Sequence, residues 1–222
     1  MEAWDRDKVS TVFADQTWLA RLIWAALLAV AAWAILEWQL ELAFVALVTL
    51  ALSLMPVFVA RWAEIHVPPS FIAALTLFIG GTLFLGEVLA FYERFWWWDV
   101  AMHGASAIGF GLIGFVLIFM MFQGDRYAAP PVAVAFFAFC FAMSVGVSWE
   151  IFEYGMDRLF GFNMQKTGLA DTMGDLMVNA LGALLGAATG FGYLKGRAYG
   201  GLGVLIDEFV QRNPRLFRRR RR

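Results

Sequence analysis

Residues 40–60 read LELAFVALVTLALSLMPVFVA, and this stretch decides the fold class. It holds a single charged residue, Glu41, at its start. The run is long enough to cross a bilayer, because an α-helix needs about 20 apolar residues to span the hydrocarbon core. It is too long for a strand of a membrane barrel, and it lacks the alternation of apolar and polar residues that such strands show. The stretch therefore predicts a transmembrane helix.

Five further apolar stretches of similar length occur along the chain. Together they give six predicted spans, at 18–36, 40–60, 71–92, 100–122, 132–152 and 176–194. The composition agrees, since 61% of the residues are hydrophobic and 16% are charged, against about 45–50% and about 25% in soluble domains. We predict an all-α, polytopic membrane helical bundle of six transmembrane helices. Its domains are a short N-terminal segment (1–17), the membrane domain (18–195) and a basic tail (196–222), with an interfacial helix as one interpretation of the tail.

The basic residues are unevenly divided between the two sides that six spans define. One side holds 14 of the 17 Lys and Arg residues, including the five arginines at 218–222, and the other holds Arg94, Arg158 and Lys166. Because cytoplasmic loops carry an excess of Lys and Arg, both termini are predicted to be cytoplasmic. Membrane lipids are the expected partners, and another membrane protein is a possible one. No nucleic-acid partner is expected, because nothing beyond the arginine tail would suit one.

Small residues predict which helices pack closely. Gly182, Gly186 and Gly190 recur at every fourth position of the last span, a pattern that lets two membrane helices approach each other. The first two spans carry no glycine. We therefore expect spans three to six to form a tight core, with the first two at its periphery.

Ionisable and amide side chains gather at one end of the later spans. Their helical spacing places each set on one helix face. The sets are Asp99 and His103; Glu150, Glu153 and Asp157; and Asp171, Asp175 and Asn179, with Glu87 in the outer part of the third span. Because lipid exposure of such groups is costly, the sequence predicts one shared pocket that opens outward.

Two of these acids have a simpler interpretation. Asp99 and Asp171 open predicted helices, where a carboxylate is favoured by free N–H groups and by the helix dipole. Glu150 and Glu153 lie instead near a helix C-terminus, and they are like charges one turn apart. A shared proton, a basic partner or a cation must offset that repulsion, so these two residues point most directly to a functional site.

Three motifs also resemble a known family. They are WWWDVAMHGASAIGFG (96–111), SVGVSWEIFEYGMD (144–157) and TGLADTMGDLMVNALGALLGA (167–187). They resemble the bacterial VanZ-like membrane proteins, and most closely the YjdF-type inner-membrane group, over about residues 95–190. The resemblance implies a bacterial inner-membrane location and agrees with an outward-facing site. VanZ-like proteins are associated with lowered susceptibility to glycopeptide antibiotics, but the resemblance supplies no reaction.

The leading functional hypothesis is a divalent-cation site that acts on a lipid headgroup or a lipid-linked substrate. Carboxylates and a histidine suit Mg²⁺, Mn²⁺ or Zn²⁺. The predicted metal ligands are Asp99, His103, Glu150, Asp171 and Asp175, the predicted catalytic residues are Glu150 and Glu153, and the supporting polar residues are Glu87, Asp157 and Asn179. The alternatives are a non-catalytic membrane partner or assembly protein and a proton-coupled transporter. The near absence of ionisable residues from the inner halves of the spans disfavours the transporter.

Overall fold

The computed structural model describes residues 14–122, 129–197 and 200–217. Within these ranges the chain is helical and has no strand. Six helices are long and apolar enough to cross a membrane, which confirms the all-α membrane fold. Some of the basic residues that predict the orientation lie outside the described residues. They are Arg6, Lys8, Arg126 and the arginines at 218–222.

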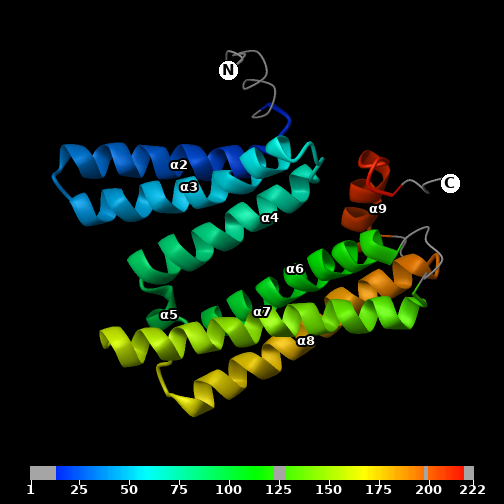
Figure 1. Cartoon of the computed structure of the whole chain (residues 1–222). Coiled ribbons are helices and arrows are strands. Elements are labelled where there is room, and N and C mark those ends of the chain that lie inside the picture. The colour runs from blue at the N-terminus through cyan, green and yellow to red at the C-terminus, as the bar shows by residue number, and fades with distance from the viewer. Residues whose placement is uncertain (1–13, 123–128, 198–199, 218–222) are drawn as a thin grey trace. The chain divides into compact units, whose positions relative to one another are not determined.

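The contacts divide the chain into two compact units, Met1–Phe95 and Trp96–Arg222. The helices of the first unit are α2 (Trp18–Leu36), α3 (Leu40–Trp62), α4 (Pro69–Ile79), the π-helical segment η1 (Gly80–Val88) and the short α5 (Phe91–Arg94), drawn from blue to green in Figure 1. The third span consists of α4 and η1 together, over Pro69–Val88.

Local signals in the first unit start its helices, and apolar side chains hold them together. The Thr17 hydroxyl accepts a hydrogen bond from the Ala20 amide at 3.3 Å and so caps α2. Trp24 and Leu27 of α2 then share one buried core with Leu50 of α3 and Ile72 of α4. The third span thus packs with the first two. The prediction that the third span packs with the glycine-rich helices is wrong, because its buried residue Ile72 packs in the core that contains Trp24 and Leu27.

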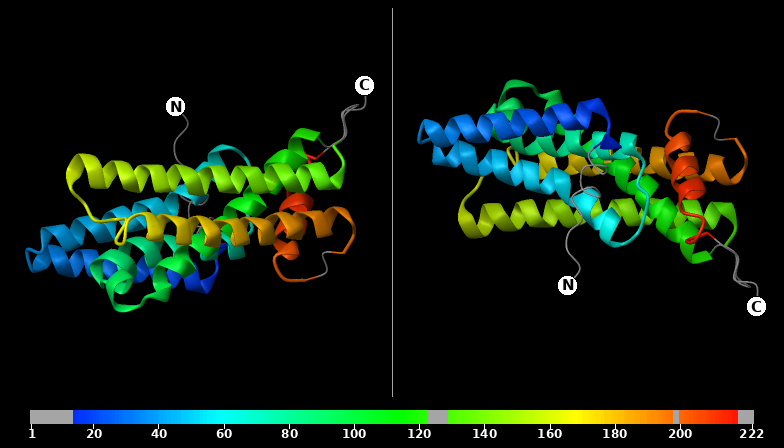
Figure 2. Two further views of the ribbon diagram at one scale, coloured as in Figure 1. Left: turned by 90° about the horizontal axis from the view of Figure 1, so that it is seen from below. Right: turned by 90° about the horizontal axis from the view of Figure 1, so that it is seen from above.

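The second unit consists of α6 (Trp97–Phe122), α7 (Pro131–Phe160), α8 (Leu169–Leu194) and the short α9 (Gly203–Arg212). Its three long helices contact one another pairwise and lie side by side in both views of Figure 2. The amphipathic α9 buries Ile206 against the core residues Leu112 and Phe115 of α6. Part of the predicted tail is therefore a packed helix, and its position at a membrane interface stays a prediction.

Glycine contacts between α6 and α8 confirm the predicted close approach. A Cβ atom added to Gly186 would lie 2.8 Å from the Gly111 Cα and 2.8 Å from the Ile108 carbonyl oxygen. One added to Gly182 would lie 2.8 Å from the Gly104 carbonyl oxygen. The backbones of the two helices therefore touch without intervening side chains, which holds their polar ends in fixed register.

Two helices extend beyond the apolar runs that predict them. Helix α7 continues to Phe160 rather than ending near residue 152, and α8 begins at Leu169 rather than near residue 176. Hydropathy marks only the lipid-crossing part of a helix, so it stops where charged residues begin. The additional turns carry Glu153, Asp157 and Asp171 at helical positions.

Candidate functional site

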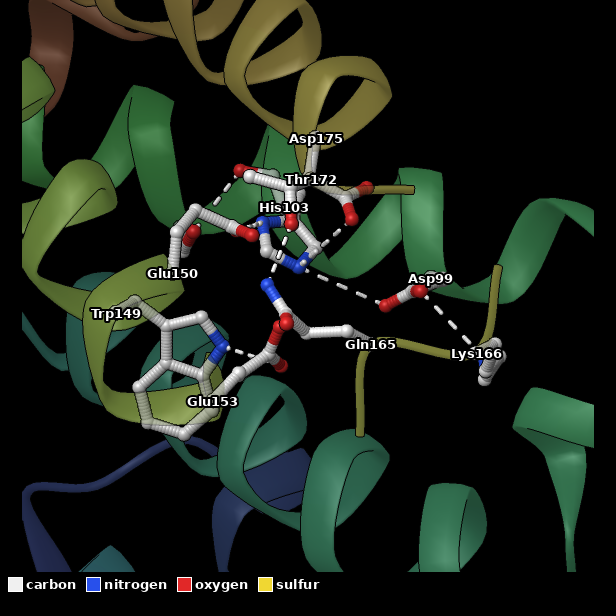
Figure 3. A network of polar contacts seen from close by, with 10 residues as sticks. Asp99, His103, Trp149, Glu150, Glu153, Gln165, Lys166, Thr172 and Asp175 are labelled. Atoms are coloured by element: carbon white, nitrogen blue, oxygen red, sulfur yellow. Dashed lines mark hydrogen bonds and ion pairs between the residues drawn. The ribbon is translucent and has the colours of Figure 1, made fainter. Parts of the chain in front are cut away.

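Three side chains of the types that can bind a metal ion, those of Asp99, His103 and Asp175, converge at the end of the second unit where α6 and α8 begin (Figure 3). The His103 Nε2 atom lies 3.6 Å from the Asp99 Oδ1 atom and 3.9 Å from the Asp175 Oδ2 atom. One ligand atom from each of the three residues lies within 4.8 Å of the other two. His103 and Asp175 are each the seventh residue of their helices, so they lie at the same depth. The predicted meeting of the α6 and α8 stripes is present in the structure.

Glu150 approaches the same imidazole from the opposite side. Its Oε1 atom lies 3.8 Å from the His103 Nδ1 atom. Only 4% of Glu150 is exposed, although it comes from α7 in a membrane-spanning segment. Neither of its carboxylate oxygens has a hydrogen-bond partner among the described residues. A buried carboxylate without donors is costly, so this residue needs a proton, a cation or a charged imidazole beside it.

Glu153 lies one turn further along α7 and is buried as well. Its Oε1 atom accepts a hydrogen bond of 2.9 Å from the indole N–H of Trp149. The indole supplies a single donor and therefore fixes one carboxylate oxygen. The other oxygen, Oε2, takes no part in this hydrogen bond.

The loop between α7 and α8 is fastened beside this cluster. Both oxygens of the Asp157 carboxylate accept backbone hydrogen bonds, from the Met164 amide at 2.7 Å and from the Gln165 amide at 2.9 Å. The Gln165 side chain in turn donates to the Thr172 hydroxyl at 2.6 Å. Asp157 thus acts as a clasp for the loop, and its role as a supporting residue of a functional site stays a prediction.

The same loop supplies a basic side chain. The Lys166 ammonium lies 3.5 Å from the Asp99 Oδ2 atom, while the other oxygen of Asp99 faces His103. Figure 3 shows Lys166 and His103 on opposite sides of the Asp99 carboxylate. Asp99 therefore joins the loop to the imidazole.

Asn179 lies one turn deeper than Asp175 on α8 and is 2% exposed. Its Nδ2 atom has no hydrogen-bond partner among the described residues. A Cβ atom on Gly146 would lie 2.7 Å from that nitrogen, so the amide rests on the bare backbone of α7. The glycine makes room for a polar side chain between the two helices.

Two predicted metal ligands, Glu150 and Asp171, lie outside the group of three residues whose ligand atoms converge, and the predicted supporting residue Glu87 lies in the other unit. Asp171 lies in the first turn of α8, but it is not among the residues whose ligand atoms converge. Glycine rather than aspartate occupies the N-cap of α8, at Gly168. Glu87 belongs to η1 in the first unit. The assignment of Asp171 as a ligand and of Glu87 as a supporting residue stays a prediction.

Trp149, Gln165 and Thr172 also lie beside this cluster, and none of them was predicted as a site residue. A signal existed for Trp149, because it lies four residues before Glu153 and therefore on the same helix face. No comparable signal existed for the pair formed by Gln165 and Thr172, since the path of a loop does not follow from spacing along a helix.

Comparisons with known proteins agree with a membrane protein. A family profile described as "Predicted membrane protein (DUF2238)" matches residues 19–196. An "Uncharacterized protein" from Thermotoga maritima is 32% identical over 103 residues, which are 44% of this chain and 50% of that protein. The chain thus spans about half the length of this relative. No solved structure matches the chain. The finer resemblance to VanZ-like and YjdF-type proteins stays a prediction.

Proposed function

Since the chain belongs to the DUF2238 family of predicted membrane proteins, we propose that its second unit binds a divalent cation among Asp99, His103 and Asp175. The observation that carries this proposal is the convergence of their ligand atoms within 4.8 Å of one another. An isolated acidic cluster would be weak support. Here a second feature points the same way, because the buried Glu150 carboxylate faces the cluster and has no hydrogen-bond partner among the described residues.

The two ring nitrogens of His103 face different carboxylates, and this suggests different roles for those carboxylates. Nε2 faces the carboxylates of Asp99 and Asp175, so it is the nitrogen that would bind the cation. Nδ1 would then carry the proton and face Glu150. Histidine ligands in metal sites commonly donate this second N–H to a carboxylate, which fixes the tautomer and the ring orientation. We therefore assign Glu150 to the support of His103 rather than to direct ligation.

The proposed substrate carries a phosphate or carbonyl oxygen in a lipid headgroup or a lipid-linked molecule. The cation would polarise that oxygen, and Glu153 is the proposed general base, with Oε2 as the accepting atom. In hydrolysis of a phosphate ester, a water oxygen bonds to phosphorus as Glu153 takes the proton. The ester P–O bond then breaks, and the leaving oxygen receives that proton. We further propose that this site faces outward from a bacterial inner membrane, with both termini in the cytoplasm, because the uneven distribution of Lys and Arg predicts that orientation.

A structural role is the second candidate, and it is supported by the same contacts. A protonated His103 lies within 3.9 Å of carboxylates from all three long helices, so it could hold α6, α7 and α8 together without any metal. In that case the protein would serve as a non-catalytic partner or assembly factor.

Metal content separates the two candidates. The purified protein in detergent is incubated with Mn²⁺, Zn²⁺ or Mg²⁺, desalted and analysed by inductively coupled plasma mass spectrometry. We expect about one ion per chain in the wild type and its loss in His103→Gln and Asp175→Asn. Glu37→Gln, which changes an exposed carboxylate of the first unit, is the matched control and keeps the ion. A wild type that retains no metal, with variants that are merely less stable, would favour the structural role.

A further inference from the structure

Asp99 contacts two basic side chains. Its Oδ1 atom faces His103 at 3.6 Å, and its Oδ2 atom faces the Lys166 ammonium at 3.5 Å. The Asp99 side chain is 22% exposed and the Lys166 side chain 34% exposed. An ion pair at this level of exposure is weak, because water screens the two charges. The contact can therefore be exchanged for a stronger one.

The structure fixes the backbone near Lys166. The two amides immediately before it, those of Met164 and Gln165, are held by the Asp157 carboxylate. The lysine side chain beyond this clasp is a flexible four-carbon stem that carries a compact charge. Rotation about the bonds of this stem can carry an ammonium group from one anion to another while the backbone stays in place.

We propose that Lys166 is a movable cation of this site. Before a divalent cation binds, it pairs with Asp99; once the cation takes Asp99, it turns to a phosphate oxyanion of the substrate. This inference rests on the proposed function, because it requires the divalent cation between α6 and α8. It adds a substrate class, an anionic phosphate group, and a residue that selects it.

The charges at this end of the unit support that choice. A divalent cation bound to Asp99 repels the nearby ammonium and weakens its attraction to the carboxylate. A phosphate bound to the same cation brings negative oxygens to the side that the ammonium already occupies. The other basic side chain at this end of the unit, Arg158, lies over the Tyr154 ring with its guanidinium carbon 5.3 Å from the ring centroid. Lys166 is therefore the basic residue whose position suits binding of the phosphate.

The test measures two affinities of the full-length chain in an uncharged detergent. Mn²⁺ is titrated by calorimetry into the wild type, Lys166→Met and Lys166→Arg. Inorganic phosphate and a short-chain phosphatidic acid are then titrated into the Mn²⁺-loaded proteins. Lys195→Met makes the same substitution at the C-cap of α8, at the other end of that helix, and is the matched control.

We expect Lys166→Met to bind Mn²⁺ about 3- to 10-fold more tightly and the phosphate probes about 3- to 10-fold more weakly, as loss of one weak charge contact implies. Lys166→Arg and Lys195→Met should stay close to the wild type in both measurements. Opposite changes in one variant are the signature of a cation that moves between two anions. Weakening for phosphatidic acid alone identifies a lipid headgroup as the source, and weakening for both probes identifies the phosphate group itself.

Other results separate the two proposals. A wild type that binds no Mn²⁺ overturns the cation site. Normal Mn²⁺ binding with an unchanged affinity in Lys166→Met overturns the role of Lys166 and leaves the cation site in place. Tighter Mn²⁺ binding with unchanged phosphate affinity also overturns the proposal, since Lys166 would then only compete for Asp99.

Discussion

The Glu150 Oε1 atom lies 3.8 Å from the His103 Nδ1 atom, on the side of the ring away from Asp99 and Asp175. A neutral imidazole donates through one nitrogen and accepts through the other. A carboxylate beside Nδ1 stabilises the tautomer whose proton lies on Nδ1, and this leaves the Nε2 lone pair for a cation. In the proposed cation site, the position of Glu150 would prepare His103 for ligation without Glu150 entering the ligand set.

Substitution of Glu150 tests this division of roles. Glu150→Gln removes the charge that orients His103, and we expect the affinity for Mn²⁺ to fall about 10- to 100-fold, the usual cost of changing such a supporting residue. Asp175→Asn should cost more, because it removes a ligand oxygen. Titration calorimetry in detergent measures both, with Glu37→Gln as the control. An affinity equal to that of the wild type in Glu150→Gln would contradict the assignment.

The Asp157 clasp predicts a local change in backbone dynamics. Asp157→Ala leaves the Met164 and Gln165 amides without the acceptors they have now. Hydrogen bonds to a charged acceptor contribute about 1.5–3 kcal/mol, so hydrogen exchange at these amides should accelerate at least tenfold. Exchange mass spectrometry of peptides that cover the loop measures the effect.

Asp207→Ala is the matched control for the clasp, because that carboxylate accepts from the Gln211 side chain rather than from backbone amides. It should leave exchange in the loop unchanged. Equal exchange in Asp157→Ala and the wild type would show that the clasp does not hold the loop in solution.

The contact between Gly186 and Gly111 predicts a stability change. In Gly186→Ala the new methyl group would lie 2.8 Å from the Gly111 Cα, so α6 and α8 must separate. Overpacking of this kind costs about 1–3 kcal/mol, and the melting temperature in detergent should fall. Gly192→Ala, on the same helix with no atom within 4 Å of the new Cβ, should match or exceed the wild type because alanine favours the helix. The prediction fails if the two variants melt alike.

The topology of the chain can be tested by labelling. Phe162 and Arg197 are exposed and follow α7 and α8, respectively. In a Cys140→Ala background, we expect a membrane-impermeant maleimide to label Phe162→Cys on intact cells and Arg197→Cys only after permeabilisation. The distribution of basic residues gives this orientation. The reverse pattern would place the cluster on the cytoplasmic side.

Sequence reasoning succeeded where one helix could be read by itself. Apolar length gave the six spans, and spacing gave the shared face of Asp99 and His103. Asp175 could be placed at the depth of His103 because both lie near the start of a helix at the same end of the bundle. These properties depend only on the rise and the period of an α-helix.

Contacts between two helices could not be predicted from the sequence. Spacing does not fix the rotation of α7 against α6, so it could not show that Glu150 faces Nδ1 of His103 rather than the cluster of ligand oxygens. The grouping of the third span depends on how well Ile72 fits the core around Trp24, and glycine content carries no information about that fit. The spacing of residues along the chain also did not predict that the Asp157 carboxylate accepts hydrogen bonds from the following loop.

The length of α7 makes the depth of the cluster sensitive to the membrane itself. Its 30 residues extend about 45 Å, whereas the hydrocarbon core is about 30 Å thick. Glu150 lies about 28 Å along the helix from Pro131, so with Pro131 at one boundary it reaches the level of the opposite headgroups. Longer acyl chains would draw the cluster into hydrocarbon, and shorter ones would expose it to water. Bilayer thickness thereby becomes a variable that sets how readily cations and headgroups reach His103.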